Sequence, residues 1–374
     1  MALAQLSNMK VHNEKVSNSQ LATFEFKKPV PTKPELTAFD PQFLTRLAEI
    51  EEKTYTVTLS SGREICYFDE SGSVDGSPAT LPVVLCIHGL GQSKELWIEP
   101  EPIPNVRLIA IDRMGHGSSS PQPVPYLFGD GVPEIGELMD KIGVEKFFVV
   151  GHSAGGPWAL QVAAGLGNGD EGRVLGAASI SGQCDLYHPT APECGSKEWN
   201  SLVTSPMITK ACGPDAGCWG GCIRNFLLKR VMGSMFYSEK KDQDFGFRQM
   251  YLENQRKGDG GCERTWEAMD NDPFFVSKNL YSTLHGCNDT TTPLGDIWRI
   301  FGKWDYDSSS FKGHCVVYNG DPETILVPMA EQAQRSIPQS DLVIMTGHGH
   351  TTIMLEGPTI IQALVAGKSA SQVY

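Results

Sequence analysis

The sequence has no apolar run of the ~18 residues that a membrane-spanning helix needs. No apolar stretch follows Met1 either, so we expect no secretory signal peptide and a cytoplasmic or organellar location. Basic residues are in the minority: 31 Lys and Arg stand against 44 Asp and Glu, a formal net charge of −13. No basic stripe offsets this charge, which argues against nucleic acid or an anionic membrane surface as a partner.

A zinc-binding pattern is also missing, although the chain contains ten cysteines. Seven of them fall between residues 183 and 312, where the closest group has neither the histidines nor the spacing of a tetrahedral zinc site. The missing signal peptide favours reduced thiols there, and disulfides in an oxidising compartment are the alternative. The remaining three lie in predicted strands and should be buried thiols: Cys66, Cys86 and Cys315.

Residues 1–53 are predicted to form an N-terminal arm that ends in a short helix. Residues 1–37 are polar and contain a proline cluster, which is typical of a loose arm. Asp40 and Pro41 suit the N-cap and first position of a helix. Four apolar residues then share one predicted helix face: Phe43, Leu44, Leu47 and Ile50.

The next part of the chain alternates between strand and helix signals. A hairpin is predicted at 54–59 and 64–68, followed by strands at 82–87, 106–111, 147–150 and 174–180, with further strands at 315–319 and 342–345. A helix is predicted at 132–142 and another from Ala154 onward. Strands separated by helices indicate a parallel sheet with functional loops at the carboxyl ends of its strands.

The most informative stretch is Gly-His-Ser-Ala-Gly at residues 151–155. It lies between the buried strand at 147–150 and a predicted helix. A serine in so tight a turn adopts strained backbone geometry, and the glycines on either side relieve the crowding. The turn lifts the hydroxyl clear of the sheet, and the helix start supplies free N–H groups. We therefore predict that Ser153 is a nucleophile.

Four motifs in this order resemble the α/β-hydrolase superfamily. They are His-Gly-Leu-Gly at 88–91, Asp-Arg-Met-Gly-His-Gly-Ser at 112–118, Gly-His-Ser-Ala-Gly-Gly at 151–156 and Gly-His-Gly-His at 347–350. The resemblance covers residues 54–182 and 313–366. It implies an α/β fold, with a mostly parallel central sheet flanked by helices in a core of residues 54–182 and 313–374. It also implies an inserted helical cap at 183–312.

The resemblance further implies a catalytic serine with three kinds of support. An imidazole must take the serine proton, a carboxylate must orient that imidazole, and backbone donors must stabilise the oxyanion. By resemblance, the oxyanion donors are the N–H groups of Leu90 and Ala154. This chemistry implies no metal and no organic cofactor.

The histidines can be separated by the family pattern. His88 resembles the histidine that anchors the oxyanion loop, and the glycine-rich loop containing His116 is expected to be structural. The family's catalytic histidine follows a glycine in the loop after the last strand and precedes a helix. His350 fits this position better than His348, which is closer to the end of the strand.

The carboxylate is assigned by counting from the glycine that ends the strand at 315–319. In the family, the acid lies three residues after this glycine, which selects Glu323. Asp321 is the runner-up, being the commoner residue type but directly following Gly320. Asp185, at the end of the preceding strand, is the third choice.

The insertion is rich in aromatic residues, which could roof an apolar pocket or form the core of the cap itself. Its tryptophans are Trp199, Trp219, Trp266, Trp298 and Trp304. A domain of this length needs its own core, so most should be structural and a minority should face the cleft. Beside the nucleophile, His152 and Trp158 are candidate substrate contacts.

The predicted function is that of a serine hydrolase that cleaves a carboxylic ester of a mainly apolar small molecule through an acyl-enzyme. An aspartate at the nucleophile position would instead have indicated haloalkane or epoxide chemistry. Thioester, lactone, amide and carbon–carbon hydrolysis stay open, as does a lyase that uses the same triad. The alternative from another class is a small-molecule receptor on the same scaffold with little turnover. No oligomeric state is predicted.

Overall fold

The computed structural model describes residues 39–71, 81–123, 126–168, 172–186, 188–189, 267, 271–286, 292–323, 326–337 and 339–369. The predicted arm at 1–37 and much of the predicted cap, including Trp199, Trp219 and Trp266, lie outside these residues. The domain boundaries and the cap therefore stay predictions. Among the described helices, none is both long and apolar enough to span a membrane.

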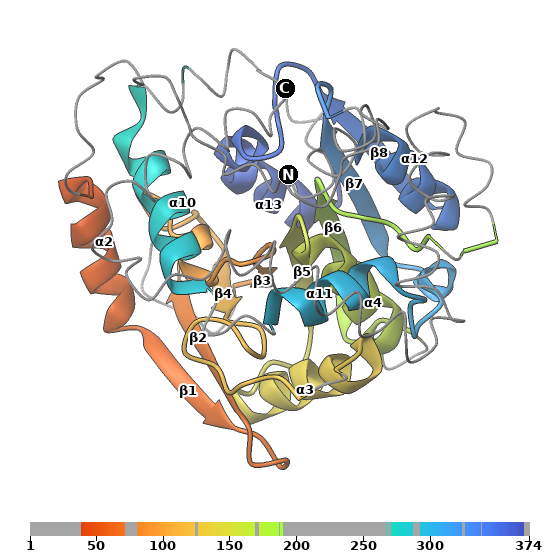
Figure 1. Cartoon of the computed structure of the whole chain (residues 1–374), viewed down its shortest axis with the longest axis horizontal. Coiled ribbons are helices and arrows are strands. Elements are labelled where there is room, and N and C mark those ends of the chain that lie inside the picture. Colours follow the sequence, from red (N-terminus) through yellow and green to blue (C-terminus); the bar gives the residue numbers. More distant parts are fainter. Residues whose placement is uncertain are drawn as a thin grey trace, which may run out of the picture.

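One eight-stranded sheet forms the centre of the molecule, in the order β1-β2-β4-β3-β5-β6-β7-β8 (Figure 1). The strands are β1 (Thr54–Thr58), β2 (Glu64–Ser71), β3 (Val83–Ile87), β4 (Arg107–Ile111), β5 (Phe147–His152), β6 (Val174–Ile180), β7 (His314–Gly320) and β8 (Ser340–Met345). The first two strands pair antiparallel with their neighbours, and all pairs from β4 to β8 are parallel. The predicted hairpin and the mostly parallel sheet are confirmed.

Helices cover both faces of the sheet (Figure 1). The α-helices are α2 (Pro41–Glu51), α3 (Phe128–Lys141), α4 (Gly155–Leu166), α10 (Pro273–Gly286), α11 (Thr292–Phe301), α12 (Leu326–Ser336) and α13 (Gly357–Val365). The described residues also include three 3-10 turns: η2 (Lys94–Trp97), η4 (Ser308–Ser310) and η5 (Thr352–Glu356). The fold is the α/β architecture that the sequence predicts.

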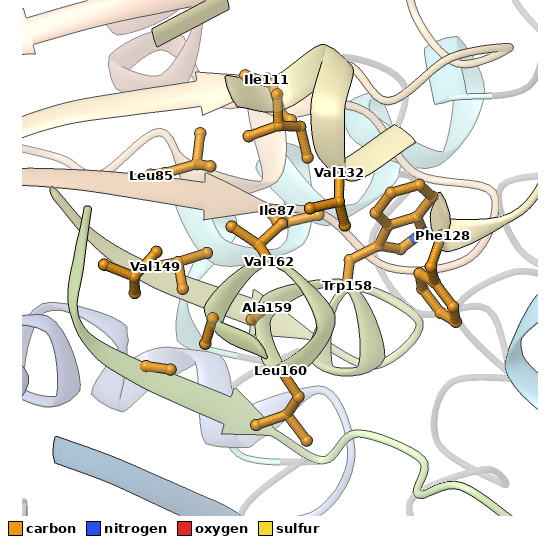
Figure 2. Close-up of a cluster of buried hydrophobic side chains, with 14 of the residues drawn as sticks. Leu85, Ile87, Ile111, Phe128, Val132, Val149, Trp158, Ala159, Leu160 and Val162 are labelled. Atoms are coloured by element: carbon orange, nitrogen blue, oxygen red, sulfur yellow. The ribbon is translucent and has the colours of Figure 1, made fainter. Parts of the chain in front are cut away.

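The central strands are buried on both faces, and successive side chains supply two separate cores. In β3, Leu85 and Ile87 pack with α3 and α4, whereas Val84 and Cys86 pack with α2, α10 and α13. This division follows from the two-residue period of a strand. Figure 2 shows the first core between the strands, α3 and α4. Burial on both faces also explains why the sequences of these strands are continuous apolar runs rather than alternating apolar and polar residues.

Helix α2 begins as predicted, since the Asp40 side chain accepts a hydrogen bond of 3.0 Å from Phe43 N–H. Leu44 is a correction: it is 44% exposed, so it does not share the buried face. The fourth buried residue of the helix is instead Arg46, which is 6% exposed and donates to the two Glu70 carboxylate oxygens at 2.8 and 2.9 Å. The paired arginine widens the buried stripe on the side away from Leu44.

Two further helix predictions need correction. The helix predicted at 132–142 starts earlier, at Phe128, with Pro133 inside it. Asp130 caps this start by accepting from Leu127 N–H at 2.8 Å, which stabilises a first turn that the proline would otherwise discourage. The segment after Thr351 begins as the 3-10 turn η5, and α13 follows from Gly357.

The three cysteines predicted in strands are buried free thiols. Burial raises the pKa of Cys66 and Cys86, and raises that of Cys315 to about 12. Cys184 is also buried. The other cap cysteines, from Cys194 onward, lie outside the described residues, so their redox state stays a prediction.

Candidate active site

Ser153 lies in the turn between β5 and α4. Its φ of 53° falls in a backbone region that residues other than glycine rarely adopt. Glycines are required on both sides of it. A Cβ on Gly151 would lie 1.9 Å from Gly155 O, and a Cβ on Gly155 would lie 2.3 Å from Ile87 O. The helix therefore starts in direct contact with the end of β3, and the turn presents the Ser153 hydroxyl beyond the sheet edge.

The structure brings the three predicted triad residues together. His350 Nε2 lies 3.0 Å from Ser153 Oγ, and His350 Nδ1 lies 2.6 Å from Glu323 Oε1. Because a carboxylate only accepts, Nδ1 donates to Glu323 and Nε2 keeps its lone pair for the serine proton. This is the tautomer that a general base at Ser153 requires. His350 follows β8 and Glu323 follows β7, so neighbouring parallel strands deliver both side chains.

Glu323 is held at its second oxygen as well. Oε2 accepts from the Ser181 hydroxyl at 2.8 Å and from Gly320 N–H at 3.4 Å, and the side chain is 3% exposed. Ser181 directly follows β6 and has a φ of 46°. Ser181 was not among the predicted site residues, although a polar side chain at the carboxyl end of the strand beside β7 was an available signal.

The alternative acids and the alternative base have other contacts. Asp321 Oδ1 accepts from Gly347 N–H at 2.9 Å, which ties the turn after β7 to the loop after β8. His348 is 3% exposed, with Nδ1 donating to Thr352 O at 3.2 Å. Asp185 lines a small cavity with His188 and Trp304.

His152 is a correction to the predicted substrate contacts. It is 2% exposed, and its Nε2 donates to the backbone carbonyl of His350 at 2.9 Å. Burial, helped by the charge that His350 can carry, lowers the pKa of His152 to about 3. The ring is therefore neutral with its proton on Nε2. His152 therefore holds the backbone of the loop that carries His350, and its burial leaves almost no surface for contact with a substrate.

Trp158 is the second correction. It is 2% exposed and stacks edge-on against Phe128 with ring centroids 4.9 Å apart. A Cβ on Gly131 would lie 2.2 Å from its ring, so α3 and α4 meet over this side chain. Figure 2 shows Trp158 beside Phe128 and Val132. The residue belongs to the core between the two helices.

The predicted oxyanion loop lies next to the nucleophile. A Cβ on Gly89 would be 3.1 Å from Ser153 Cβ and 3.4 Å from His152 O, so the Gly89–Leu90 peptide borders the serine turn. Ala154, on the other side, is the N-cap residue of α4. His88 anchors the loop as predicted: Nδ1 donates to Gly89 O at 2.9 Å, and Nε2 accepts from Arg113 N–H at 3.1 Å. Burial lowers the pKa of His88 well below its usual value.

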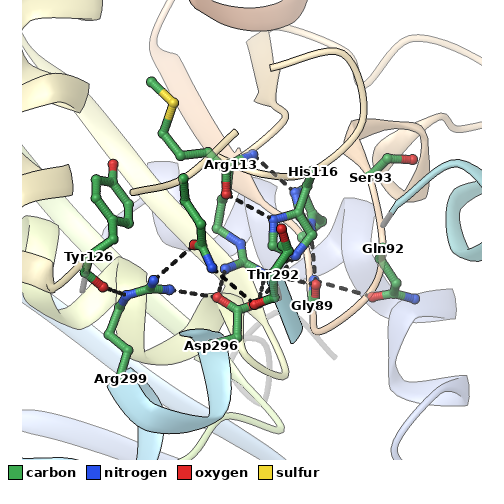
Figure 3. Close-up of polar contacts among 12 residues, drawn as sticks. Gly89, Gln92, Ser93, Arg113, His116, Tyr126, Thr292, Asp296 and Arg299 are labelled. Carbon is green, nitrogen blue, oxygen red and sulfur yellow. Dashed lines mark hydrogen bonds and ion pairs between the residues drawn. The ribbon is translucent and has the colours of Figure 1, made fainter. Parts of the chain in front are cut away.

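The loop at 112–118 is structural, as expected. Asp112 Oδ1 accepts from Lys94 N–H at 2.8 Å, and Oδ2 accepts from Ser118 N–H at 3.0 Å. A Cβ on Gly117 would lie 2.1 Å from that carboxylate. A buried charge cluster beyond the loop was not predicted. In it, Asp296 of α11 pairs with Arg113 (Figure 3).

No metal site emerges from the part of the chain that the structure describes, where no three His, Cys, Asp or Glu side chains are grouped to hold an ion. The predicted absence of a cofactor stays a prediction.

Known proteins share this fold. A family model described as alpha/beta hydrolase fold matches residues 82–200, which include β3, β4, the Ser153 turn and β6. A hydrolase from Pseudomonas aeruginosa has a similar structure, with a TM-score of 0.53, 15% identity, and coverage of 83% of this chain and 96% of that one. The chain has the α/β-hydrolase fold.

Curated relatives match over shorter segments. The acetyltransferase component of an acetoin cleaving system from Cupriavidus necator is 35% identical over 100 residues, 26% of each chain. Lipase LipV from Mycobacterium tuberculosis is 35% identical over 82 residues, 22% of this chain and 31% of the lipase. The chain thus spans about a third or less of the length of these two relatives.

The choice of acid yields a prediction with matched variants. Glu323→Gln should lower kcat by about 10³- to 10⁴-fold, because an amide can neither hold the required tautomer nor stabilise the imidazolium. Asp321→Asn should lower it only a few-fold at most, since the amide oxygen can still accept from Gly347 N–H. Ester hydrolysis rates and urea midpoints of both variants check this. A larger loss in Asp321→Asn at equal stability would transfer the role to Asp321.

Proposed function

We propose that the protein is a serine hydrolase that cleaves a carboxylic ester of a mainly apolar small molecule. The observation that carries this proposal is the continuous hydrogen-bonded chain from Ser153 Oγ through His350 to Glu323, at 3.0 and 2.6 Å. A strained, glycine-flanked serine with such a chain has no evident structural use. The likeness to a lipase over 82 residues supports ester chemistry.

In the proposed reaction, Ser153 Oγ attacks the ester carbonyl while His350 Nε2 takes its proton. The tetrahedral intermediate carries its charge on the former carbonyl oxygen, between the N–H groups of Leu90 and Ala154. When the intermediate collapses, the bond to the alcohol breaks, and His350 returns the proton to the leaving oxygen. Water then repeats both steps on the acyl-enzyme and releases the acid.

The electrostatics of the site favour these reaction steps. Glu323 is ready to stabilise the imidazolium that forms at each proton transfer, and the second bond from Ser181 fixes its orientation. Each oxyanion donor is worth about 3 kcal/mol of transition-state stabilisation in comparable enzymes. Ala154 N–H lies at the start of α4, where the helix dipole adds to its donor strength.

The apolar character of the substrate rests on the sequence of the insertion and on the general chemistry of such pockets. Trp304 is 6% exposed and packs against Phe128 with ring centroids 5.7 Å apart, so this insertion aromatic belongs to the core. That agrees with a structural role for most of the insertion's tryptophans. We expect only a minority of the insertion's aromatic residues to line the pocket.

The function is tested with a fluorophosphonate probe and a panel of p-nitrophenyl esters with acyl chains of different length and charge. We expect covalent labelling, sustained turnover, and a preference for apolar over anionic acyl groups. Labelling without sustained turnover would favour the receptor alternative. Neither labelling nor turnover would reject the proposed function, and a preference for anionic esters would reject the apolar pocket.

A further inference from the structure

The strongest unused feature of the molecule is the buried charge cluster between the loop after β4 and helix α11 (Figure 3). Its charged members are Arg113, Asp296 and Arg299, which are 4%, 0% and 2% exposed. Arg113 Nη1 and Nη2 contact the two oxygens of Asp296 at 2.6 and 2.8 Å, and Arg299 Nη1 contacts Oδ1 at 2.6 Å. Burial alone would raise the pKa of Asp296, but the facing charges hold it well below its usual value.

Arg113 also contacts the oxyanion loop. Its Nη2 donates to the Gly89 carbonyl oxygen at 2.9 Å, and His88 Nδ1 donates to the same oxygen at 2.9 Å. A carbonyl has two lone pairs, so these two donors saturate it. Gly89 N–H is fixed as well, by the Gln92 side-chain oxygen at 3.2 Å.

The geometry of the peptide bond transmits this restraint to the next residue. In a planar trans peptide, the C=O of one residue and the N–H of the next point in opposite directions. When the Gly89 carbonyl is held toward Arg113 and His88, the Leu90 N–H must point the other way. Within the described residues, that N–H has no backbone acceptor. The Gly89 Cα borders the nucleophile, since a Cβ placed on it would lie 3.1 Å from Ser153 Cβ.

We infer that Arg113 and Asp296 are positioning residues that orient the Leu90 N–H as an oxyanion donor. Arg113 clamps the carbonyl of the same peptide, and Asp296 fixes the guanidinium from the opposite side. The inference rests on the proposed hydrolase function. Because Asp296 belongs to α11, in the segment predicted as cap, the donor depends on a helix about 200 residues away in the sequence.

The cluster provides a matched control for this role. Arg299 shares Asp296 with Arg113, but its other side-chain bonds go to Tyr126 O and Gln122 Oε1, at 2.8 and 3.0 Å. Arg113→Gln and Arg299→Gln each remove one buried cation and leave Asp296 with one arginine. Only the first variant removes a bond to the Gly89 carbonyl.

The test measures kcat and KM for p-nitrophenyl butyrate, inhibition by phenylboronic acid, and urea unfolding of both variants. Losing one oxyanion donor entirely costs about 10²- to 10³-fold in kcat elsewhere, so a misdirected donor in Arg113→Gln should cost about 10- to 100-fold. KM should change little. Inhibition by the boronate, which binds serine as a tetrahedral anion, should weaken in parallel. Arg299→Gln should keep kcat and boronate affinity at comparable stability.

Equal losses of kcat in the two variants would reduce Arg113 to a general structural role and overturn the inference, as would an unchanged kcat in Arg113→Gln. If Arg113→Gln does not fold, Arg113→Lys replaces it. A lysine keeps the charge opposite Asp296, but one ammonium does not reproduce the two-sided fork, so the same loss of kcat is expected.

Crystal structures of the wild type and Arg113→Gln separate this inference from the proposed function. The Gly89–Leu90 peptide should rotate in the variant and stay in place in Arg299→Gln, whether or not the protein hydrolyses esters. An unchanged peptide in Arg113→Gln would refute the clamp. An inactive wild type with a rotated peptide in the variant would leave the clamp standing and reject the hydrolase.

Discussion

Ser153→Ala is expected to reduce ester turnover by about 10⁶-fold, the loss seen when the nucleophile of a serine hydrolase is removed. The hydroxyl lies 3.0 Å from His350 Nε2, and no acyl-enzyme can form without it. Labelling by the fluorophosphonate should disappear completely. The fold should persist, because alanine keeps the Cβ that the backbone at φ 53° already accommodates.

The control for this variant is another buried serine close to the turn. Ser179 of β6 is 1% exposed, and its Oγ would lie 2.4 Å from a Cβ on Gly156, just behind the start of α4. Ser179→Ala should retain wild-type labelling and turnover. Urea unfolding and labelling are measured on all three proteins. If Ser153→Ala hydrolyses the ester at more than about a thousandth of the wild-type rate, the acyl-enzyme route through Ser153 is ruled out.

The sheet and the serine turn could be predicted because they depend on local signals. Strands such as β3 and β5 are short, apolar and buried on both faces, and the chain alternates them with helices. Gly151 and Gly155 lie so close to the backbone of other residues that no larger residue fits. The two glycines of the Gly-x-Ser-x-Gly pattern are therefore a direct sequence signal of this turn. Glu323 was selected by the spacing that the resemblance implies, counted from Gly320, which ends β7.

The two wrong substrate contacts show where proximity in sequence misleads. His152 directly precedes a serine that faces the cleft, and neighbouring side chains at the end of a strand point to opposite sides. Trp158 lies five residues after Ser153, inside α4, and contacts Phe128 of α3. Both residues are almost fully buried against other parts of the protein.

Contacts between distant segments could not be predicted from patterns of this kind. Ser181 reaches Glu323 across 142 residues, and Arg113 reaches Asp296 across 183. Neither contact has a fixed spacing or a periodic signal, because each depends on which loops meet at the edge of the sheet. Asp296 pairs with both Arg113 and Arg299, and this pairing became recognisable only once the structure placed α11 against the loop after β4.

The second large effect concerns the base. His350→Ala should lower kcat by about 10⁵- to 10⁶-fold, close to the loss in Ser153→Ala, because nucleophile and base act as one unit. His350 Nε2 lies 3.0 Å from Ser153 Oγ and Nδ1 lies 2.6 Å from Glu323 Oε1, so the side chain connects the other two residues. The double variant with Ser153→Ala should be no slower than either single variant.

His348→Ala provides the comparison, because it removes the same side chain two residues away in the same loop. His348 is buried, its Nδ1 bonds Thr352 O at 3.2 Å, and its Nε2 lies 3.5 Å from Glu356. Its loss should lower stability and reduce kcat by about tenfold or less, through a loosened loop rather than a missing base. Rates of ester hydrolysis and of fluorophosphonate labelling, compared at equal folded fraction, decide between the two histidines. Since labelling also requires the base, His350→Ala should slow it in step with turnover, while His348→Ala should label at close to the wild-type rate. The opposite order would make His348 the base and leave the contact between His350 and Ser153 without a catalytic role.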